Sequence, residues 1–165
     1  MRLADLGLSV QMPSGASGAL HVPVCTLLYQ SPEQLFGTPS GYGARADVWG
    51  LGCILAELLT GEPFFAAAKT FNHLIELVLH RFGEEAFESW PEVKASKNFV
   101  NNQQRLRKNS GLRGYFKSRR PNIDPLALDL LERILTLNPE DRPSASELLR
   151  HPWFTVAPLP CESKG

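Results

Sequence analysis

Two neighbouring stretches decide the fold: Thr26-Leu27-Leu28-Tyr29-Gln30-Ser31-Pro32-Glu33 and Asp47-Val48-Trp49-Gly50-Leu51-Gly52-Cys53. The second stretch lies in a segment, residues 46–59, whose apolar side chains fall on nearly every face of a helix. A helix that is apolar almost all round belongs in the centre of a domain. Gly61 supplies its stop. We therefore predict a central helix over about 46–59, with one helical turn at 32–36 before it.

Three further helices are predicted from their start and stop signals. One helix is predicted to start at Thr70 as its N-cap and to end near Gly83. Its buried residues are expected to be Phe71, Leu74, Ile75 and Val78. Asp124-Pro125 opens the next helix, which Asn138-Pro139 ends; its apolar face is Leu128, Leu131, Ile134 and Leu135. Ser144 and Glu147 form a capping box for a last helix that Pro152 ends.

The remaining segments are expected to be less regular. Residues 2–4 and 8–10 read as remnants of short strands on either side of a turn at Asp5-Leu6-Gly7. Residues 84–122 are polar and interrupted by Trp90-Pro91, so we predict a long insert with little regular structure. The predicted fold class is mainly α, and 156–165 is expected to be a tail.

Composition restricts the class of protein. The 165 residues fit one domain, and 17 basic residues balance 17 acidic ones, so no global charge favours nucleic acid or an acidic membrane surface. Cys25, Cys53 and Cys161 form neither a disulfide framework nor a zinc cluster and fit a reducing compartment. No apolar run approaches the ~20 residues of a membrane span, and the first residues lack a signal-peptide core. A cytoplasmic or nuclear protein without nucleic-acid or membrane partners is predicted.

The order of several short motifs resembles one known family. Asp5-Leu6-Gly7 is followed by a loop, then Ser31-Pro32-Glu33, then Asp47 opening an apolar helix, then Asp141-Arg142-Pro143. Protein kinases show this order from their Asp-Phe-Gly motif onward. The cyclin-dependent and mitogen-activated kinase group is the most similar, on three stretches: 42–49, 62–65 and 89–92. Residues 142–145 and 151–154 also resemble the shared ending.

The resemblance implies that residues 1–155 are the large, C-terminal lobe of a kinase domain. Its activation segment would be 5–33, its central helix about 46–59 and its group-specific insert about 84–122. Only four residues precede Asp5, whereas such kinases place their phosphate-binding loop, lysine and catalytic Asp earlier in the chain. His80-Arg81 is followed by Phe82 and does not replace the catalytic loop. We therefore expect negligible activity from this chain alone.

Residue roles follow from the resemblance. Asp5 would hold the magnesium ion that bridges the ATP phosphates, in the complete parent kinase. Thr26 would lie beside the catalytic centre, in a substrate loop that also contains Leu28, Tyr29 and Gln30. No tight binding of Mg or ATP by this chain alone is expected.

Structural roles are also implied for three residues. Glu33 would form a buried bidentate ion pair with Arg142, tying the activation segment to the last helices. Asp47 would accept backbone N–H bonds from the catalytic loop, which this chain lacks.

The chain departs from the group's pattern at four positions. Leu6 replaces phenylalanine, Leu28 replaces tryptophan, and His21 occupies the position of the activating threonine. Gln30 replaces an arginine that helps to shape a pocket favouring proline after the target hydroxyl. The resemblance therefore implies phosphorylation of Ser or Thr in protein substrates, without establishing proline-directed specificity.

Other functions remain open. The chain is alternatively a non-catalytic protein-binding module, with a docking partner at the insert 84–122, or an unstable product without function. The basic residues of the insert favour either a docking patch or nuclear-import signal, or simply a solvated loop; they are Arg105, Arg107, Lys108, Arg113, Lys117, Arg119 and Arg120.

Overall fold

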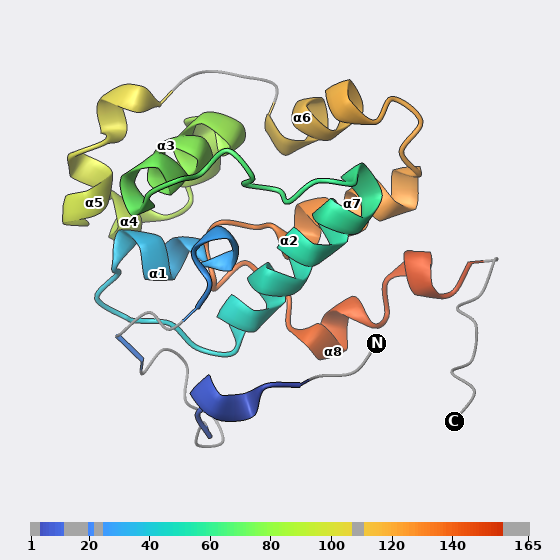
Figure 1. Ribbon diagram of the computed structural model, residues 1–165, viewed down its shortest axis with the longest axis horizontal. Coiled ribbons are helices and arrows are strands. Elements are labelled where there is room, and N and C mark those ends of the chain that lie inside the picture. Colours follow the sequence, from blue (N-terminus) through green and yellow to red (C-terminus); the bar gives the residue numbers. More distant parts are fainter. Residues whose placement is uncertain (1–3, 12–19, 22–24, 107–110, 157–165) are drawn as a thin grey trace.

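The computed structural model describes residues 4–11, 20–21, 25–106 and 111–156. The fold is mainly helical, as predicted (Figure 1). Within the described ranges the β-pairing is one isolated antiparallel bridge between Leu20 and Tyr42. The strand prediction at residues 8–10 is wrong: Leu6–Leu8 forms a 3₁₀ turn, and residues 4–11 are all exposed. Without a neighbouring strand, an extended segment there has no ladder to join. Residues 2 and 3 lie outside the described ranges.

The elements follow in this order. The α-helices are α1 (Pro32–Phe36), α2 (Arg45–Thr60), α3 (Phe71–Phe82), α4 (Pro91–Lys94), α5 (Lys97–Val100), α6 (Gly111–Arg119), α7 (Pro125–Ile134) and α8 (Ala145–Leu148). The 3₁₀ turns are η1 (Leu6–Leu8), η2 (Leu27–Tyr29), η3 (Glu85–Phe87), η4 (Gln103–Arg105) and η5 (Pro152–Phe154).

The insert is more regular than predicted, because α4, α5, α6 and two 3₁₀ turns lie within 84–122. Large apolar side chains attach these short helices to the core. Phe87, Trp90, Val93, Phe99 and Phe116 are each at most 4% exposed. Phe36 of α1 meets Phe87, Trp90 and Phe99 edge to face, with ring centroids 5.8, 6.3 and 5.9 Å apart. The polar composition concealed this spacing of aromatic anchors.

Helix α2 crosses the molecule next to α7, close to the predicted bounds (Figure 1). Gly52 allows the two helices to approach closely, because a Cβ atom there would lie 2.4 Å from Ile134 Cγ2. The buried residues of α2 are Val48, Trp49, Gly52, Cys53 and Ala56.

The opposite face of α2 is open, although its apolar residues, on nearly every face, predicted a helix in the centre of the domain. Leu51 is 41% exposed, Ile54 39% and Leu58 73%. These three apolar residues are spaced three and four apart and therefore share one helix face. We call them the α2 open face. No described element covers it fully.

Helices α3 and α7 bury most of the residues predicted for them. Leu74, Ile75 and Val78 of α3 are fully buried, but Phe71, its first residue, is 37% exposed because it lies at the helix end. The predicted N-caps Thr70 and Asp124 each accept a backbone N–H three residues on. Helix α7 ends at Ile134, earlier than predicted, and all four residues of its predicted apolar face are at most 6% exposed.

The C-terminal segment is held to α7 by a histidine. The His151 ring is buried, its Nε2 lies 2.7 Å from Asp129 Oδ2, and its Nδ1 accepts the Trp153 backbone N–H at 3.1 Å. Hydrogen bonds from His151 and then from Arg133 lower the pKa of the Asp129 carboxyl. Ser144 and Glu147 form the predicted capping box of α8. Across the described part of the chain, no helix combines the length and apolarity needed to cross a bilayer.

Candidate functional site

Glu33 and Arg142 lie 109 positions apart in sequence, and the structure brings them together. Arg142 Nη1 donates to Glu33 Oε1 and Nη2 to Oε2, both at 2.9 Å, and both side chains are fully buried. Glu33 stands in the first turn of α1, where the helix N-terminus favours a negative charge. A bidentate pair of this kind fixes both the distance and the orientation of the two segments.

The remaining donors of Arg142 are also satisfied. Nε donates to the Thr136 carbonyl at 2.9 Å, Nη1 to the Arg45 carbonyl at 2.6 Å, and Nη2 to the Leu137 carbonyl at 3.0 Å. With the two bonds to Glu33, all five N–H groups of the guanidinium have acceptors. Its carbon lies 5.2 Å from the centroid of the Trp49 ring. One side chain thus joins α1, the start of α2 and the segment after α7.

The loop that precedes α1, residues 25–30, is anchored at its C-terminal end, while its first residues, Cys25 and Thr26, are exposed. Thr26 is exposed, and Leu28 lies half-buried in the 3₁₀ turn η2. The Tyr29 hydroxyl donates to Glu57 Oε2 of α2 at 2.9 Å, and this hydrogen bond raises the pKa of Tyr29. Helix α1 follows directly and carries the loop on the Glu33 anchor.

Gln30 reaches back along the same loop. Its side chain is 9% exposed, and its Nε2 donates to the Cys25 carbonyl at 3.5 Å, the long limit of a hydrogen bond. Its Oε1 is buried and has no hydrogen-bond partner. The carbonyl of Cys25 is therefore occupied by a neutral amide, where a charged guanidinium would form a stronger bond.

Asp47 stands in the first turn of α2 and is exposed. No described residue hydrogen-bonds its carboxylate. The α2 open face continues along the same helix from this end. Sequence reasoning missed that three apolar residues of this helix would be left uncovered. The signal was present in the apolar spacing of Leu51, Ile54 and Leu58.

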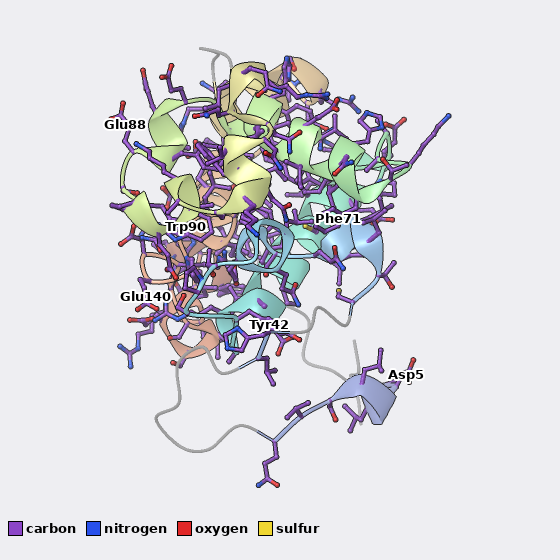
Figure 2. All side chains as sticks on the ribbon, turned by 90° about the vertical axis from the view of Figure 1, so that its left-hand side faces the viewer. Asp5, Tyr42, Phe71, Glu88, Trp90 and Glu140 are labelled. Carbon is purple, nitrogen blue, oxygen red and sulfur yellow. The ribbon has the colours of Figure 1, made fainter. Side chains whose placement is uncertain are left out.

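Asp5 lies in the exposed segment 4–11. It is the one non-glycine residue of the described part with a positive φ, 61°. Figure 2 shows Asp5 apart from the helical body. Across the described residues no three His, Cys, Asp or Glu side chains gather as metal ligands. A hard cation such as Mg²⁺ wants several oxygen ligands, so this set of residues does not by itself fit a magnesium site.

Most basic residues of the insert are already paired. Arg113 pairs with Glu132, Arg105 with Glu76, and Arg119 with Glu62, the last at 3.0 Å. Arg120 Nη1 donates to the Leu59 carbonyl at 2.9 Å. Arg107 and Lys108 lie outside the described residues. These ion pairs favour a solvated, self-compensated surface over an extended basic docking patch.

Comparison with known proteins agrees with the family that the sequence motifs indicated. The protein kinase domain family matches residues 1–154. Cyclin-dependent kinase C-1 of Oryza sativa subsp. japonica is 36% identical over 165 residues, which is 100% of this chain and 31% of the rice protein. Serine/threonine-protein kinase ppk23 of Schizosaccharomyces pombe is 36% identical over 166 residues, covering 99% of this chain and 40% of the yeast protein. Mitogen-activated protein kinase 17 of rice is 39% identical over 158 residues, covering 93% and 26%.

Among solved structures, the CAK complex of Chaetomium thermophilum bound to ATP-gamma-S contains a similar chain. The TM-score is 0.70 at 31% identity, over 82% of this chain and 41% of the other. The chain therefore spans well under half the length of each of these relatives.

Proposed function

The chain belongs to the protein kinase family, and on that premise we propose that residues 1–155 form the C-terminal lobe of an ATP-dependent serine/threonine kinase of the cyclin-dependent type. The Glu33–Arg142 pair carries this proposal. It is fully buried and bidentate, and it fixes α1, and with it residues 25–30, onto the helices that follow.

In this proposal residues 26–30 receive the protein substrate. Thr26 is exposed and lies at the start of the loop, so it is the residue nearest to a target hydroxyl, while Tyr29 and Glu57 hold the loop against α2. Asp5 supplies one magnesium ligand in the complete parent kinase, where Mg and ATP bind with residues from elsewhere. Those residues orient the phosphates and neutralise their charge.

The 165 residues alone transfer no phosphate. Their only His-Arg pair, His80-Arg81, lies at the end of α3 and is followed by Phe82, so it supplies no catalytic Asp. The rest of the kinase domain covers the α2 open face, with backbone N–H groups on the Asp47 carboxylate. Support comes from the exposed apolar residues Leu51, Ile54 and Leu58, which cost free energy in water.

A graft tests the proposal. Residues 4–156 replace the corresponding segment of rice cyclin-dependent kinase C-1, and transfer of phosphate to a library of Ser/Thr peptides is measured. We expect transfer by the graft, and a loss of roughly tenfold to hundredfold with Thr26→Ala, because small displacements at the reacting centre are costly. Thr155→Ala, a change at an exposed threonine in the C-terminal segment, is the matched control. A graft that folds and binds ATP but transfers nothing to any peptide would contradict the proposal.

The α2 open face also favours a second candidate, a non-catalytic protein-binding module in the cytoplasm or nucleus. An exposed apolar stripe is a usual feature of an association surface. The insert 84–122 would add a docking surface for a partner. The two candidate functions predict different effects of Leu58→Lys. If the chain is a protein-binding module, this change abolishes capture of a partner by the isolated chain. If the kinase proposal is correct, it lowers activity of the graft instead.

A further inference from the structure

Gln34 of α1 carries a hydrogen-bond donor that no described residue uses. Its Oε1 accepts the backbone N–H of Ser31 at 2.9 Å and the Ser31 hydroxyl at 3.1 Å, which closes the capping box of α1. Since the Ser31 backbone N–H can only donate, the amide oxygen of Gln34 has to face it, and the Nε2 amino group therefore points away from Ser31. No described residue accepts a hydrogen bond from Nε2, although Gln34 is only 8% exposed.

Gln34 lines a half-enclosed cavity of about 200 Å³, which lies between α1, residues 37–42 and residues 20–21. Nε2 of Gln34 is not sealed into the protein: in contrast to the partnerless Gln30 oxygen, it keeps contact with solvent. A molecule that enters the cavity can therefore reach the N–H groups of this amide. Pockets for drug-sized ligands measure roughly 300–1,000 Å³, so the cavity fits a smaller molecule.

Backbone hydrogen bonds hold the walls of the cavity in place. Leu20 and Tyr42 form the antiparallel bridge: the Leu20 N–H donates to the Tyr42 carbonyl at 3.3 Å, and the Tyr42 N–H to the Leu20 carbonyl at 2.9 Å. The Gly41 N–H donates to the Thr38 carbonyl at 3.0 Å and closes a turn. Gly41 has a φ of 71°, and a Cβ atom there would lie 2.5 Å from the Leu20 carbonyl oxygen, so glycine is required. The cavity is thus formed before any ligand arrives, which lowers the entropic cost of binding.

The lining residues favour an uncharged ligand. Glu33 lies next to Gln34 on the cavity wall, and its carboxylate is already neutralised by Arg142. An anion in the cavity would lie near this carboxylate, with His21 as the single basic side chain on the wall. A cation would face the N–H groups of Gln34. A neutral carbonyl oxygen accepts from an amide N–H without either repulsion.

We propose that this cavity binds a small uncharged carboxamide as a free molecule. The carbonyl oxygen of the ligand accepts from Gln34 Nε2, and its apolar body lies against Leu20 and Tyr42, which line the same cavity. Helix α1, which carries Gln34, is labelled in Figure 1, and Tyr42 is labelled in Figure 2. None of the lining residues belongs to the loop 25–30, and the site does not depend on transfer of phosphate.

The test is a titration of the whole chain, labelled with ¹⁵N-glutamine, with benzamide at pH 8, where imidazole side chains of ordinary pKa are neutral. We expect the side-chain NH₂ signals of Gln34 to shift saturably, with a dissociation constant on the order of 1–10 mM. Gln103, exposed in η4, is the internal control and should not respond. Benzoate has the same shape but a negative charge, and acetamide has the carbonyl without the ring. Each should bind at least roughly tenfold more weakly than benzamide.

Two variants separate the donor from the cavity. Gln34→Glu removes the donor and keeps the cap, because a glutamate oxygen also accepts from Ser31. Followed by saturation transfer to the benzamide protons, it should weaken binding by roughly tenfold or more, whereas Gln103→Glu, the same change on the surface, should leave binding unchanged. Leu20→Trp fills the cavity and should abolish the Gln34 response.

Three results would overturn the proposal. They are a linear response of Gln34 equal to that of Gln103, undiminished binding in a folded Gln34→Glu protein, and benzoate binding as tight as that of benzamide. If Gln34→Glu does not fold, the wild-type titration and Leu20→Trp still decide.

Discussion

Replacing Glu33 by glutamine should destabilise the protein more than any surface charge change of equal size. The glutamine oxygen can accept one Arg142 N–H, but its amide N–H groups then face the other donor. The guanidinium, fully buried, is left without a counter-charge. Breaking a buried pair by removing one partner costs about 3–5 kcal/mol.

That loss of free energy is large relative to the total stability of the domain. A domain of this kind is stable by about 5–15 kcal/mol, so Glu33→Gln removes roughly a fifth of its stability at the least and all of it at the most. For a chain of this length each kcal/mol lowers Tm by roughly 2–4 °C, and the expected fall is therefore about 6–20 °C. Urea unfolding, followed by tryptophan fluorescence, measures the lost free energy of unfolding, and a thermal scan measures the fall in Tm. Tryptophan fluorescence is a suitable signal because the Trp49 ring lies against the Arg142 guanidinium.

Two controls isolate the cause. Glu62→Gln breaks an ion pair whose side chains are 64% and 46% exposed, and it should cost no more than about 1 kcal/mol. Glu33→Gln combined with Arg142→Met removes both charges, so its cost should be clearly smaller than the sum of the two single changes. A Glu33→Gln cost as small as that of Glu62→Gln would refute the reasoning.

Three further outcomes are expected. Gly52→Ala should lower Tm through overpacking of roughly 1–3 kcal/mol, whereas Gly50→Ala, where an added Cβ meets nothing within 4 Å, should leave Tm unchanged or raise it. The pKa of Asp129 is lowered in the folded state, mainly by its hydrogen bond to His151. The Asp129 carboxylate therefore stabilises the fold above its unfolded pKa, and this contribution is lost as the pH falls through its folded pKa. Between pH 6 and pH 2, Tm should therefore fall less steeply for Asp129→Asn than for the unchanged protein. In the grafted kinase, Gln30→Arg should increase the preference for peptides with proline after the target residue, because a guanidinium holds the Cys25 carbonyl more firmly than an amide does; equal peptide profiles for the two proteins would exclude this role.

Local signals were sufficient for most of the helices. The caps at Thr70, Asp124 and Ser144 predicted the starts of α3, α7 and α8, because a side-chain oxygen at these positions satisfies the first free N–H groups whatever the rest of the fold does. The insert was mispredicted for the opposite reason. Its helices are short, and aromatic anchors such as Phe99 stabilise them only by reaching a core formed by distant residues.

The candidate site divides in the same way. The order of the motifs around Glu33, Asp47 and Arg142 indicated the family and the identity of the buried pair. The sequence could not predict that Arg142 would find five acceptors, because three of them are backbone carbonyls positioned by other segments.

By itself, the sequence determined the family, the helices that begin at strong caps, and the residues able to form a buried ion pair. Only the tertiary structure decided which face of α2 is covered, that Asp5 lies apart from the helical body, and that Arg81 lies among three aromatic rings. The physical reason is that helix caps and charge types are properties of neighbouring residues, whereas burial and pairing depend on which distant surfaces meet.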